Sequence, residues 1–338
     1  MVRLAVVRHP NAEARHRSST TASRGAVPEF VLIHGLASNA RMWDGVGAAL
    51  AERGYASIAV DLRGHGRSPK PPVYGEGHEE PGYGFDEVSA DVLQLLDDEG
   101  LVDDRRPTIV GQSLGGNVVV ELAANHPGRI RAVAAIDGGV IRLGERFPDW
   151  NECESRLAPP DLAGTPVERI RAWMTSAHPD WPQSGIEGSL ANFEVRHDGT
   201  IAAWLSRDRH LAILRALWEH DPVASFARLA VPAALLLADS AADWSHDKAV
   251  GAAQCANASP VPVDIEWFAG ADHDLHAQHP VRTADSLIRL HEKANTAALQ
   301  STRNASIPHP ASPPHTASSP PSPVLSPVPS PENGSTPR

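Results

Sequence analysis

The 338-residue chain has little of three things that would point to particular classes of protein: cysteine, long apolar runs and excess positive charge. Its two cysteines, Cys153 and Cys255, are too few for a disulfide framework, and neither belongs to a Cys-x-x-Cys pair for zinc or redox chemistry. The longest apolar stretches, such as residues 233–238, fall far short of the roughly 18 residues that a transmembrane helix needs. We therefore expect a soluble protein with reduced thiols.

Acidic residues outnumber basic ones, 41 against 30, so the formal net charge is −11 at pH 7. Binding to nucleic acid or to an anionic membrane requires a basic patch, and the only group of arginines, in residues 3–24, is sparse. The expected partner is therefore a small molecule rather than a nucleic acid or a membrane, and the oligomeric state stays open. The apolar run between Arg3 and Arg8 is too short for a signal peptide, so a cytoplasmic location is expected.

Between residues 28 and 297, short runs of Val, Ile, Leu and Ala alternate with segments of helical period. This alternation predicts an α/β fold with a mostly parallel central sheet and flanking helices. We expect strands at residues 29–34, 56–61, 108–111, 130–136, 233–238 and 263–268, and helices at residues 40–53, 86–99, 114–125, 248–256 and 281–294.

Residues 140–225 break the alternation. They carry several tryptophans and helical patterns, such as those at residues 167–174 and 201–218, which predict a helical cap over the carboxyl ends of the strands. The composition changes again near residue 300, where proline and serine dominate and few charges remain. The expected organisation is an N-terminal extension with an edge strand at residues 3–7 (1–27), an α/β core (28–139 and 226–297), a cap (140–225) and a disordered tail (298–338).

The strongest functional motif is Gly111-Gln112-Ser113-Leu114-Gly115, which joins a buried strand to a helical segment. A G-x-S-x-G sequence in this context predicts a sharp turn that exposes the serine hydroxyl above the sheet. Glycine is needed at positions 111 and 115 because side chains there would hold the strand and the helix apart. Ser113 is therefore the candidate nucleophile.

A serine hydroxyl needs a histidine base to become nucleophilic at neutral pH. His273 follows the last predicted strand, which places it at the carboxyl edge of the sheet beside the serine turn. The spacing His273, His276, His279 also suggests a metal site, but residues three and six apart diverge around a helix. We therefore favour His273 as the base and expect no metal.

The third member of such a triad is a carboxylate that orients the histidine from the end of another strand. Three residues fit this position: Asp243 and Asp239 after the penultimate strand, and Asp137 after the strand at residues 130–136. We prefer Asp243, then Asp239, then Asp137, because a few loop residues past the strand would let the acid swing beneath the histidine.

Acyl transfer also needs two backbone N–H groups aimed at the developing oxyanion. Leu114, the residue after the nucleophile, supplies one of them. The first buried strand ends in His34-Gly35-Leu36, so the Leu36 N–H is the expected second donor, and Gly35 permits close approach. His34 is interpreted as a buried residue that braces this loop.

With these motifs the sequence resembles the α/β-hydrolase family, in particular its capped serine hydrolases with an HG-x oxyanion loop. Two further stretches carry the resemblance: residues 61–69, which match a D-x-R-G-x-G-x-S loop, and Gly270-Ala271-Asp272-His273, which matches the histidine loop. The likeness covers residues 28–295. It departs from the family after the penultimate strand, where Ala238 stands in place of the usual glycine.

The resemblance implies a carboxylic-ester hydrolase that needs no cofactor. Dehalogenases and epoxide hydrolases of this fold have Asp where this chain has Ser113, so ester, lactone or thioester chemistry is expected, on a small and apolar substrate. The same residues also serve C–C bond hydrolases, acyltransferases and cofactor-free perhydrolases. An alternative of another class is a non-catalytic ligand-binding or interaction protein that uses this scaffold.

Overall fold

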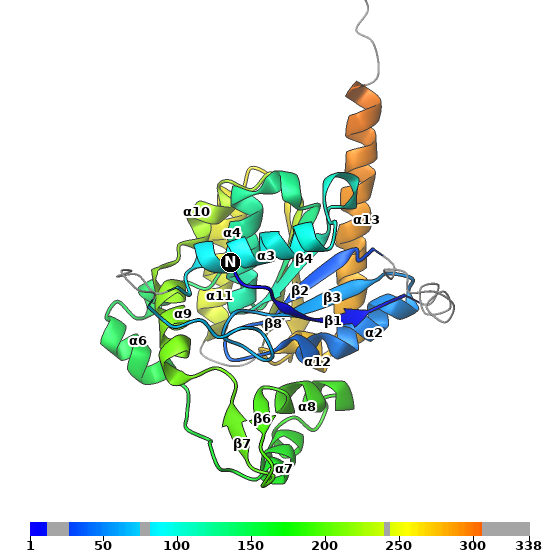
Figure 1. The fold of residues 1–338 in the computed structure, drawn as a ribbon. Helices are drawn as coiled ribbons and strands as arrows, with labels where there is room; N and C mark the ends of the chain where they lie inside the picture. Colours follow the sequence, from blue (N-terminus) through cyan, green and yellow to red (C-terminus); the bar gives the residue numbers. More distant parts are fainter. Residues whose placement is uncertain (12–26, 75–81, 240–243, 306–338) are drawn as a thin grey trace, which may run out of the picture. The chain divides into compact units, whose positions relative to one another are not determined.

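The computed structural model describes residues 1–11, 27–74, 82–239 and 244–305. Its first unit, residues 1–298, is built on a seven-stranded sheet with the order β1-β3-β2-β4-β5-β8-β9 (Figure 1). β1 is antiparallel to β3, and all other neighbours are parallel. The strands are β1 (Ala5–His9), β2 (Phe30–Ile33), β3 (Ser57–Asp61), β4 (Thr108–Gln112), β5 (Ala132–Ile136), β8 (Ala233–Asp239) and β9 (Val263–Ala269).

The strands confirm the predicted α/β fold. Each of the strands expected between residues 29 and 268 is present, with ends that differ by at most two residues from the prediction. The N-terminal edge strand is also present, but it begins at Ala5 and ends at His9, two residues later than expected. Short apolar runs identify these strands because both faces of the parallel part of the sheet are covered.

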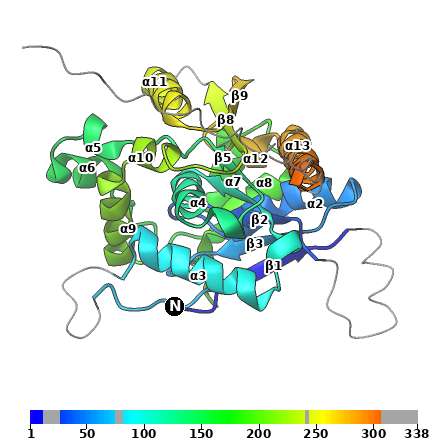
Figure 2. The same ribbon diagram turned by 90° about the horizontal axis from the view of Figure 1, so that it is seen from above.

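Two hydrophobic cores form on the two faces of the sheet because strand side chains alternate between them. On one face, Val31 and Ile33 pack with α3 (Phe85–Asp98) and α4 (Leu114–Asn125). On the other face, Phe30 and Leu32 pack with α2 (Asp44–Glu52) and α13 (Pro280–Ala305). Figure 2 shows the sheet between these helices.

The parallel register brings the loops after several strands to one edge of the sheet. Ile33 pairs with Gly111, and Gln112 pairs with Ile136, so the chain positions that follow β2, β4 and β5 are neighbours. β9 pairs with β8 and ends just before the predicted histidine loop. The carboxyl edge of the sheet is where open α/β sheets bind ligands.

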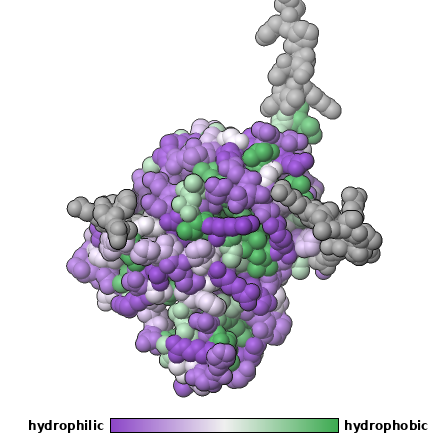
Figure 3. Space-filling view, viewed as in Figure 1, coloured by the Kyte–Doolittle hydropathy of each residue, from purple (hydrophilic) through white to green (hydrophobic). Residues whose placement is uncertain are grey.

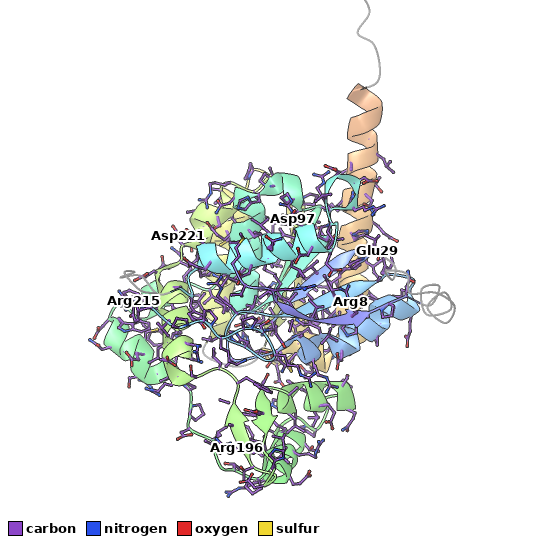
Figure 4. The ribbon with its side chains drawn as sticks, in the orientation of Figure 1. Arg8, Glu29, Asp97, Arg196, Arg215 and Asp221 are labelled. Atoms are coloured by element: carbon purple, nitrogen blue, oxygen red, sulfur yellow. The ribbon has the colours of Figure 1, made fainter. Side chains whose placement is uncertain are left out.

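A long insertion separates β5 from β8 and contains most of the small elements of the fold. Figure 4 shows two of its labelled arginines far apart, Arg196 after β6 and Arg215 on α9. The inserted elements are α5 (Leu143–Arg146), α6 (Trp150–Leu157), α7 (Val167–Ala177), α8 (Gln183–Leu190), β6 (Phe193–Val195), β7 (Ile201–Ala203), α9 (Arg207–Glu219) and α10 (Pro222–Phe226).

The helix expected at residues 201–218 is wrong over its first part. Residues 201–203 form β7, which pairs antiparallel with β6, and the helix begins only at Arg207. Gly199, with φ of 78°, reverses the chain between the two strands. The start of the segment therefore forms part of a hairpin, while the residues of helical period that follow form α9.

The remaining helices refine two other predictions. The helix expected at residues 40–53 is divided into a 3-10 turn, η1 (Ala40–Trp43), and α2. The helix expected at residues 281–294 continues as α13 to Ala305. Good helix formers and the absence of proline between residues 281 and 305 explain the extension. Residues 306–338 lie outside the described part. The last elements are α11 (Trp244–Ala258), α12 (Leu275–Gln278), η2 (Asp103–Arg105) and η3 (Pro127–Arg129).

The face drawn in Figure 3 is largely hydrophilic, with apolar residues scattered between polar ones. Among the helices of the described residues, none has the length and apolar character required to cross a bilayer.

Candidate active site

Ser113 lies in a strained turn between β4 and α4. Its φ of 54° and ψ of −122° are rare for a residue with a side chain, a conformation that costs on the order of 1–3 kcal/mol. The two predicted glycines make the turn possible. A Cβ at Gly111 would lie 2.0 Å from the Gly115 carbonyl oxygen, and a Cβ at Gly115 would lie 2.5 Å from the His34 carbonyl oxygen. The sequence therefore forms the sharp elbow that was predicted.

Two further glycines let neighbouring loops pack against Ser113. A Cβ at Gly35, in the loop after β2, would lie 2.9 Å from Ser113 Cβ, and a Cβ at Gly138, after β5, would lie 2.7 Å from Ser113 Cα. The Ser113 N–H donates to the Ile136 carbonyl oxygen at 2.9 Å. The turns that follow β2 and β5 therefore both contact the serine directly.

His273 and Asp137 form a hydrogen-bonded pair. The distance from His273 Nδ1 to Asp137 Oδ2 is 2.6 Å. The histidine side chain is 55% exposed and the carboxylate only 3%, so the ring faces the open side of the pair. Burial lowers the pKa of His273, but the hydrogen bond to Asp137 and the charges of Asp274 and Asp137 outweigh it, and the pKa is raised overall.

Asp137 is held from several sides. Its Oδ1 accepts from the Ala238 N–H at 2.9 Å and forms an ion pair with Lys248 Nζ at 2.6 Å. Burial favours the neutral acid, but the hydrogen bonds from His273 and Lys248 outweigh this effect and lower the pKa of Asp137. The carboxylate is therefore charged at neutral pH, with one oxygen turned to His273 and the other to Lys248 and Ala238.

The structure describes the contacts of two of the three acid candidates. Asp243 lies outside the described residues, and Asp239 is an exposed residue at the end of β8 whose carbonyl oxygen accepts from the Gly270 N–H. Asp137, placed last, is the carboxylate that contacts His273. Asp137 directly follows β5, with no loop residue between them. Its positive φ of 41° turns the chain immediately after β5 and brings the carboxylate to the histidine.

The loop after β2 carries Leu36, whose N–H is the expected second backbone donor. Within the described residues, neither the Leu36 N–H nor the Leu114 N–H donates to a protein acceptor. Leu114 is the first residue of α4, where backbone N–H groups have no partner within the helix and carry partial positive charge. Neither N–H is therefore engaged by a protein acceptor in the described residues.

His34 fixes the orientation of this loop. Its Nε2 accepts from the Leu62 N–H at 3.1 Å, so the proton is on Nδ1, which donates to the Gly35 carbonyl oxygen at 2.7 Å. In a trans peptide the carbonyl and the following N–H point in opposite directions, so this hydrogen bond turns the Leu36 N–H away from His34. Burial lowers the pKa of His34, which keeps it neutral. The predicted bracing role is in agreement with these contacts.

The loop at residues 61–69 supports the same region. Asp61 Oδ1 accepts from the Ala40 N–H and Oδ2 from the Arg67 N–H, both at 2.8 Å. His65 Nε2 accepts from the Ala37 N–H at 3.2 Å. This loop therefore fixes the geometry of the turn after β2, as expected for a structural motif.

Gln112 and Lys248 belong to the site but were missed in the sequence. Gln112 precedes the serine, and its Nε2 donates to the His273 carbonyl oxygen at 3.3 Å, which ties the elbow to the histidine loop. Lys248 comes from α11, more than a hundred residues from Asp137 in the chain. Gln112 is a variable position of the motif, and Lys248 belongs to a helix without a motif of its own, so neither carries a signal that sequence alone could reveal.

The other two histidines of the loop do not converge on one point. His276 is fully buried and packs on Trp43 with ring centroids 4.4 Å apart, and burial lowers its pKa to about 3. His279 packs instead on Phe268. No group of three or more His, Cys, Asp or Glu side chains that could hold a metal ion is found in the described residues.

The insertion contacts the histidine loop through Asp272. His178 Nδ1 lies 3.1 Å from Asp272 Oδ2, and Trp181 Nε1 donates to the same oxygen at 3.0 Å. The Asp272 N–H in turn donates to Gln278 Oε1 at 2.7 Å, and Gln278 Nε2 donates to Asp180 at 2.5 Å. The residue before His273 is therefore anchored to the segment between α7 and α8.

A small apolar pocket lies next to the elbow, between the core and α9. The pocket's polar side chains are already engaged: Arg63 pairs with Asp91 at 2.7 Å, and His65 bonds to backbone. No tryptophan is among its lining residues, and Trp173 of the insertion is 60% exposed. The lining residues are Leu62, Arg63, His65, Tyr83, Gly84, Phe85, Val88, Leu114, Val118, Ile213 and Ala216.

Comparison with known proteins gives consistent matches. Residues 28–226 match the model of the alpha/beta hydrolase fold. The chain is 25% identical over 266 residues to 2-(acetamidomethylene)succinate hydrolase of Mesorhizobium japonicum, which covers 78% of this chain and 88% of that protein. The crystal structure of E-2-(acetamidomethylene)succinate hydrolase superposes with a TM-score of 0.64 at 24% identity and covers 80% of this chain and 93% of that one.

Other relatives match a shorter part of the chain at a higher sequence identity. An uncharacterized protein of Mycobacterium tuberculosis is 38% identical over 125 residues, which is 35% of this chain. The matched region covers only 31% of that longer protein. These likenesses concern the fold and the shared part of the chain.

Proposed function

Because this chain belongs to the alpha/beta hydrolase fold family, we propose that it is a serine hydrolase that cleaves a carboxylic ester, lactone or thioester through an acyl-enzyme on Ser113. The observation that carries the proposal is the 2.6 Å hydrogen bond between His273 and Asp137 at the sheet edge that also presents Ser113. In this proposal His273 is the base and Asp137 is the acid that orients it.

The first half-reaction forms the acyl-enzyme. Ser113 Oγ attacks the carbonyl carbon while its proton passes to His273 Nε2, and the carbonyl oxygen becomes an oxyanion. As the oxyanion collapses, the bond to the leaving group breaks and His273 gives the proton to that group. Asp137 remains ionised throughout and stabilises the imidazolium that forms in between.

The second half-reaction is hydrolysis. Water attacks the acyl carbon and gives a proton to His273, and collapse of the new oxyanion returns that proton to Ser113 Oγ and releases the acid. The Leu36 and Leu114 N–H groups stabilise both oxyanions. Their lack of protein acceptors within the described residues supports this role, because donors already engaged would be unavailable to the transition state.

The apolar pocket favours an uncharged acyl or alcohol group. Phe85, Leu114 and Ile213 contribute apolar surface there, and the lining residue Arg63 is already neutralised by Asp91. A charged group in this pocket would lose its hydration without gaining a free counter-ion among the lining residues. In our proposal residues 140–225 act as a cap, because α9 forms one wall of the pocket.

Initial rates on a panel of substrates test the proposal. We expect hydrolysis of p-nitrophenyl esters, with kcat/KM rising from acetate to butyrate and lower for the charged hemisuccinate. Ser113→Ala should lower kcat by about 10⁴-fold or more, as in other serine hydrolases. Turnover of a C–C bonded β-diketone substrate without ester turnover would replace this proposal by the C–C hydrolase alternative. Ligand binding without turnover of any substrate would favour the non-catalytic one.

A further inference from the structure

We propose that Lys248 is a positioning residue that fixes the Asp137 carboxylate and keeps His273 in its neutral, basic form towards lower pH. The inference rests on the proposed function, since it concerns how the same acid and base are tuned. It assigns a role in the site to a helix, α11, whose other residues have no part in the reaction described above.

The Lys248 ammonium group is in direct contact with the Asp137 carboxylate. Lys248 Nζ is 2.6 Å from Asp137 Oδ1 and donates to the Ala238 carbonyl oxygen at 2.8 Å. The lysine side chain is only 14% exposed, so this pair is shielded from solvent far more than a surface ion pair. Two fixed acceptors hold the ammonium in one place.

The two oxygens of the Asp137 carboxylate have different partners. Oδ1 forms the ion pair with the Lys248 ammonium and accepts a hydrogen bond from the Ala238 N–H, while Oδ2 forms the hydrogen bond with His273 Nδ1. Rotation of the carboxylate about its Cβ–Cγ bond would break both sets of contacts at once. Lys248 therefore orients Oδ2 towards the histidine.

The second consequence is electrostatic. An adjacent anion stabilises the imidazolium, and a cation on that anion offsets part of this stabilisation. Burial lowers the pKa of His273 and the Asp137 hydrogen bond raises it, and the Lys248 charge acts with burial to limit the rise. A base that is neutral over a wider pH range is active over a wider range, because only the neutral ring can accept the serine proton.

Other charged groups near His273 also affect its pKa. Asp274 follows it in the loop and raises its pKa, while Asp272 is paired with His178 from the insertion. Buried His276, in α12, titrates only at much lower pH. None of these groups contacts Asp137 through a described hydrogen bond or ion pair, so Lys248 is the cation that acts on it directly. Asp243 lies outside the described residues.

The test uses the full chain and three lysine variants. Lys248→Met and Lys248→Gln remove the charge, and Lys248→Arg keeps it. Lys293→Met is the matched control, because it also removes a lysine from an ion pair. Lys293 of α13 pairs with Asp264 of β9 at 2.7 Å, and the Lys293 side chain is 52% exposed. The pH dependence of kcat/KM is measured for each variant, and the titration of the His273 imidazole is followed independently by NMR.

We expect the neutral variants to move the acidic limb of kcat/KM to higher pH, so that activity at pH 6 falls by about 3- to 10-fold more than at pH 8. The arginine variant and the Lys293→Met control should keep the limb of the wild type. A uniform loss at all pH values, an unmoved limb or an equal shift in Lys248→Arg would overturn the inference.

The NMR titration separates the two proposals. If the enzyme proves inactive on all substrates, the proposed function fails, but His273 still titrates at higher pH in Lys248→Met if the inference holds. If ester hydrolysis is confirmed and the His273 titration is the same in Lys248→Met and in the wild type, the inference is wrong and the proposed function stands.

Discussion

Asp137→Asn is the substitution that most directly probes the acid assignment. The amide is nearly isosteric with the carboxylate, so its orientation is decided by hydrogen bonds. Position Oδ1 faces two donors, the Ala238 N–H and Lys248 Nζ, and therefore retains an oxygen. The amide nitrogen is then placed at the position of Oδ2, 2.6 Å from His273 Nδ1. Two donors cannot share that contact.

The histidine responds by changing its tautomer. Its Nδ1 becomes an acceptor from the amide, and the proton moves to Nε2, the nitrogen that must accept the proton of Ser113 in the proposed mechanism. In known triads the wrong tautomer lowers kcat by about 10⁴-fold. This corresponds to about 5 kcal/mol of lost transition-state stabilisation.

Steady-state kinetics with a p-nitrophenyl ester measure this loss. Asp239→Asn is the matched control and should remain within about 10-fold of the wild type, since Asp239 is exposed and surface substitutions away from the site have small effects. Asp243→Asn tests the alternative acid and should also remain within about 10-fold if Asp137 is the acid. Thermal unfolding of each variant checks that the fold is intact. An Asp137→Asn enzyme within 10-fold of the wild type, or a larger loss in Asp243→Asn, would refute the assignment of Asp137.

Three other predictions address the oxyanion loop, acid stability and the tail. Gly35→Ala should lower kcat/KM by about 10²-fold or more, measured on the same ester, because the new Cβ would lie 2.4 Å from Gln112 Oε1 and displace the loop that carries a proposed oxyanion donor. The neutral form of buried His276, with its pKa lowered to about 3, contributes stability that is present above pH 6.5 and is lost as the pH falls towards 3. In urea titrations at pH 7 and pH 4, His276→Phe should therefore lose less stability than the wild type, by at most about 3 kcal/mol, and an equal loss would contradict this role. Deletion of residues 306–338 should leave kcat unchanged within two-fold in the ester assay, and a large loss would assign those residues a part in the reaction.

The parts of the site that are local in sequence could be predicted. The elbow at Ser113, the helix from Leu114 to Asn125 and the loop with Leu36 are each determined by a few adjacent residues whose types the turn requires. His273 was placed correctly at the sheet edge because the order of strands in a parallel sheet fixes where their carboxyl ends meet.

The parts of the site that depend on contacts between distant segments could not be predicted from the sequence. Asp137 and Asp239 end neighbouring strands, β5 and β8, and the choice between them depends on the turn at Asp137 and on the position of Lys248. The contacts of His178 and Trp181 with Asp272 likewise join segments about 90 residues apart. The strand at Ile201–Ala203 was missed because its pairing with β6 overrides local helical periodicity.

Labelling with a fluorophosphonate probe, followed by peptide mass mapping, tests the central claim most directly. A serine reacts with such a probe only when a base and an oxyanion site activate it. The account predicts a single adduct on Ser113 that is abolished by His273→Ala and strongly slowed by Asp137→Asn. An adduct on another serine, or labelling of Ser113 that is unaffected by His273→Ala, would contradict the proposed mechanism.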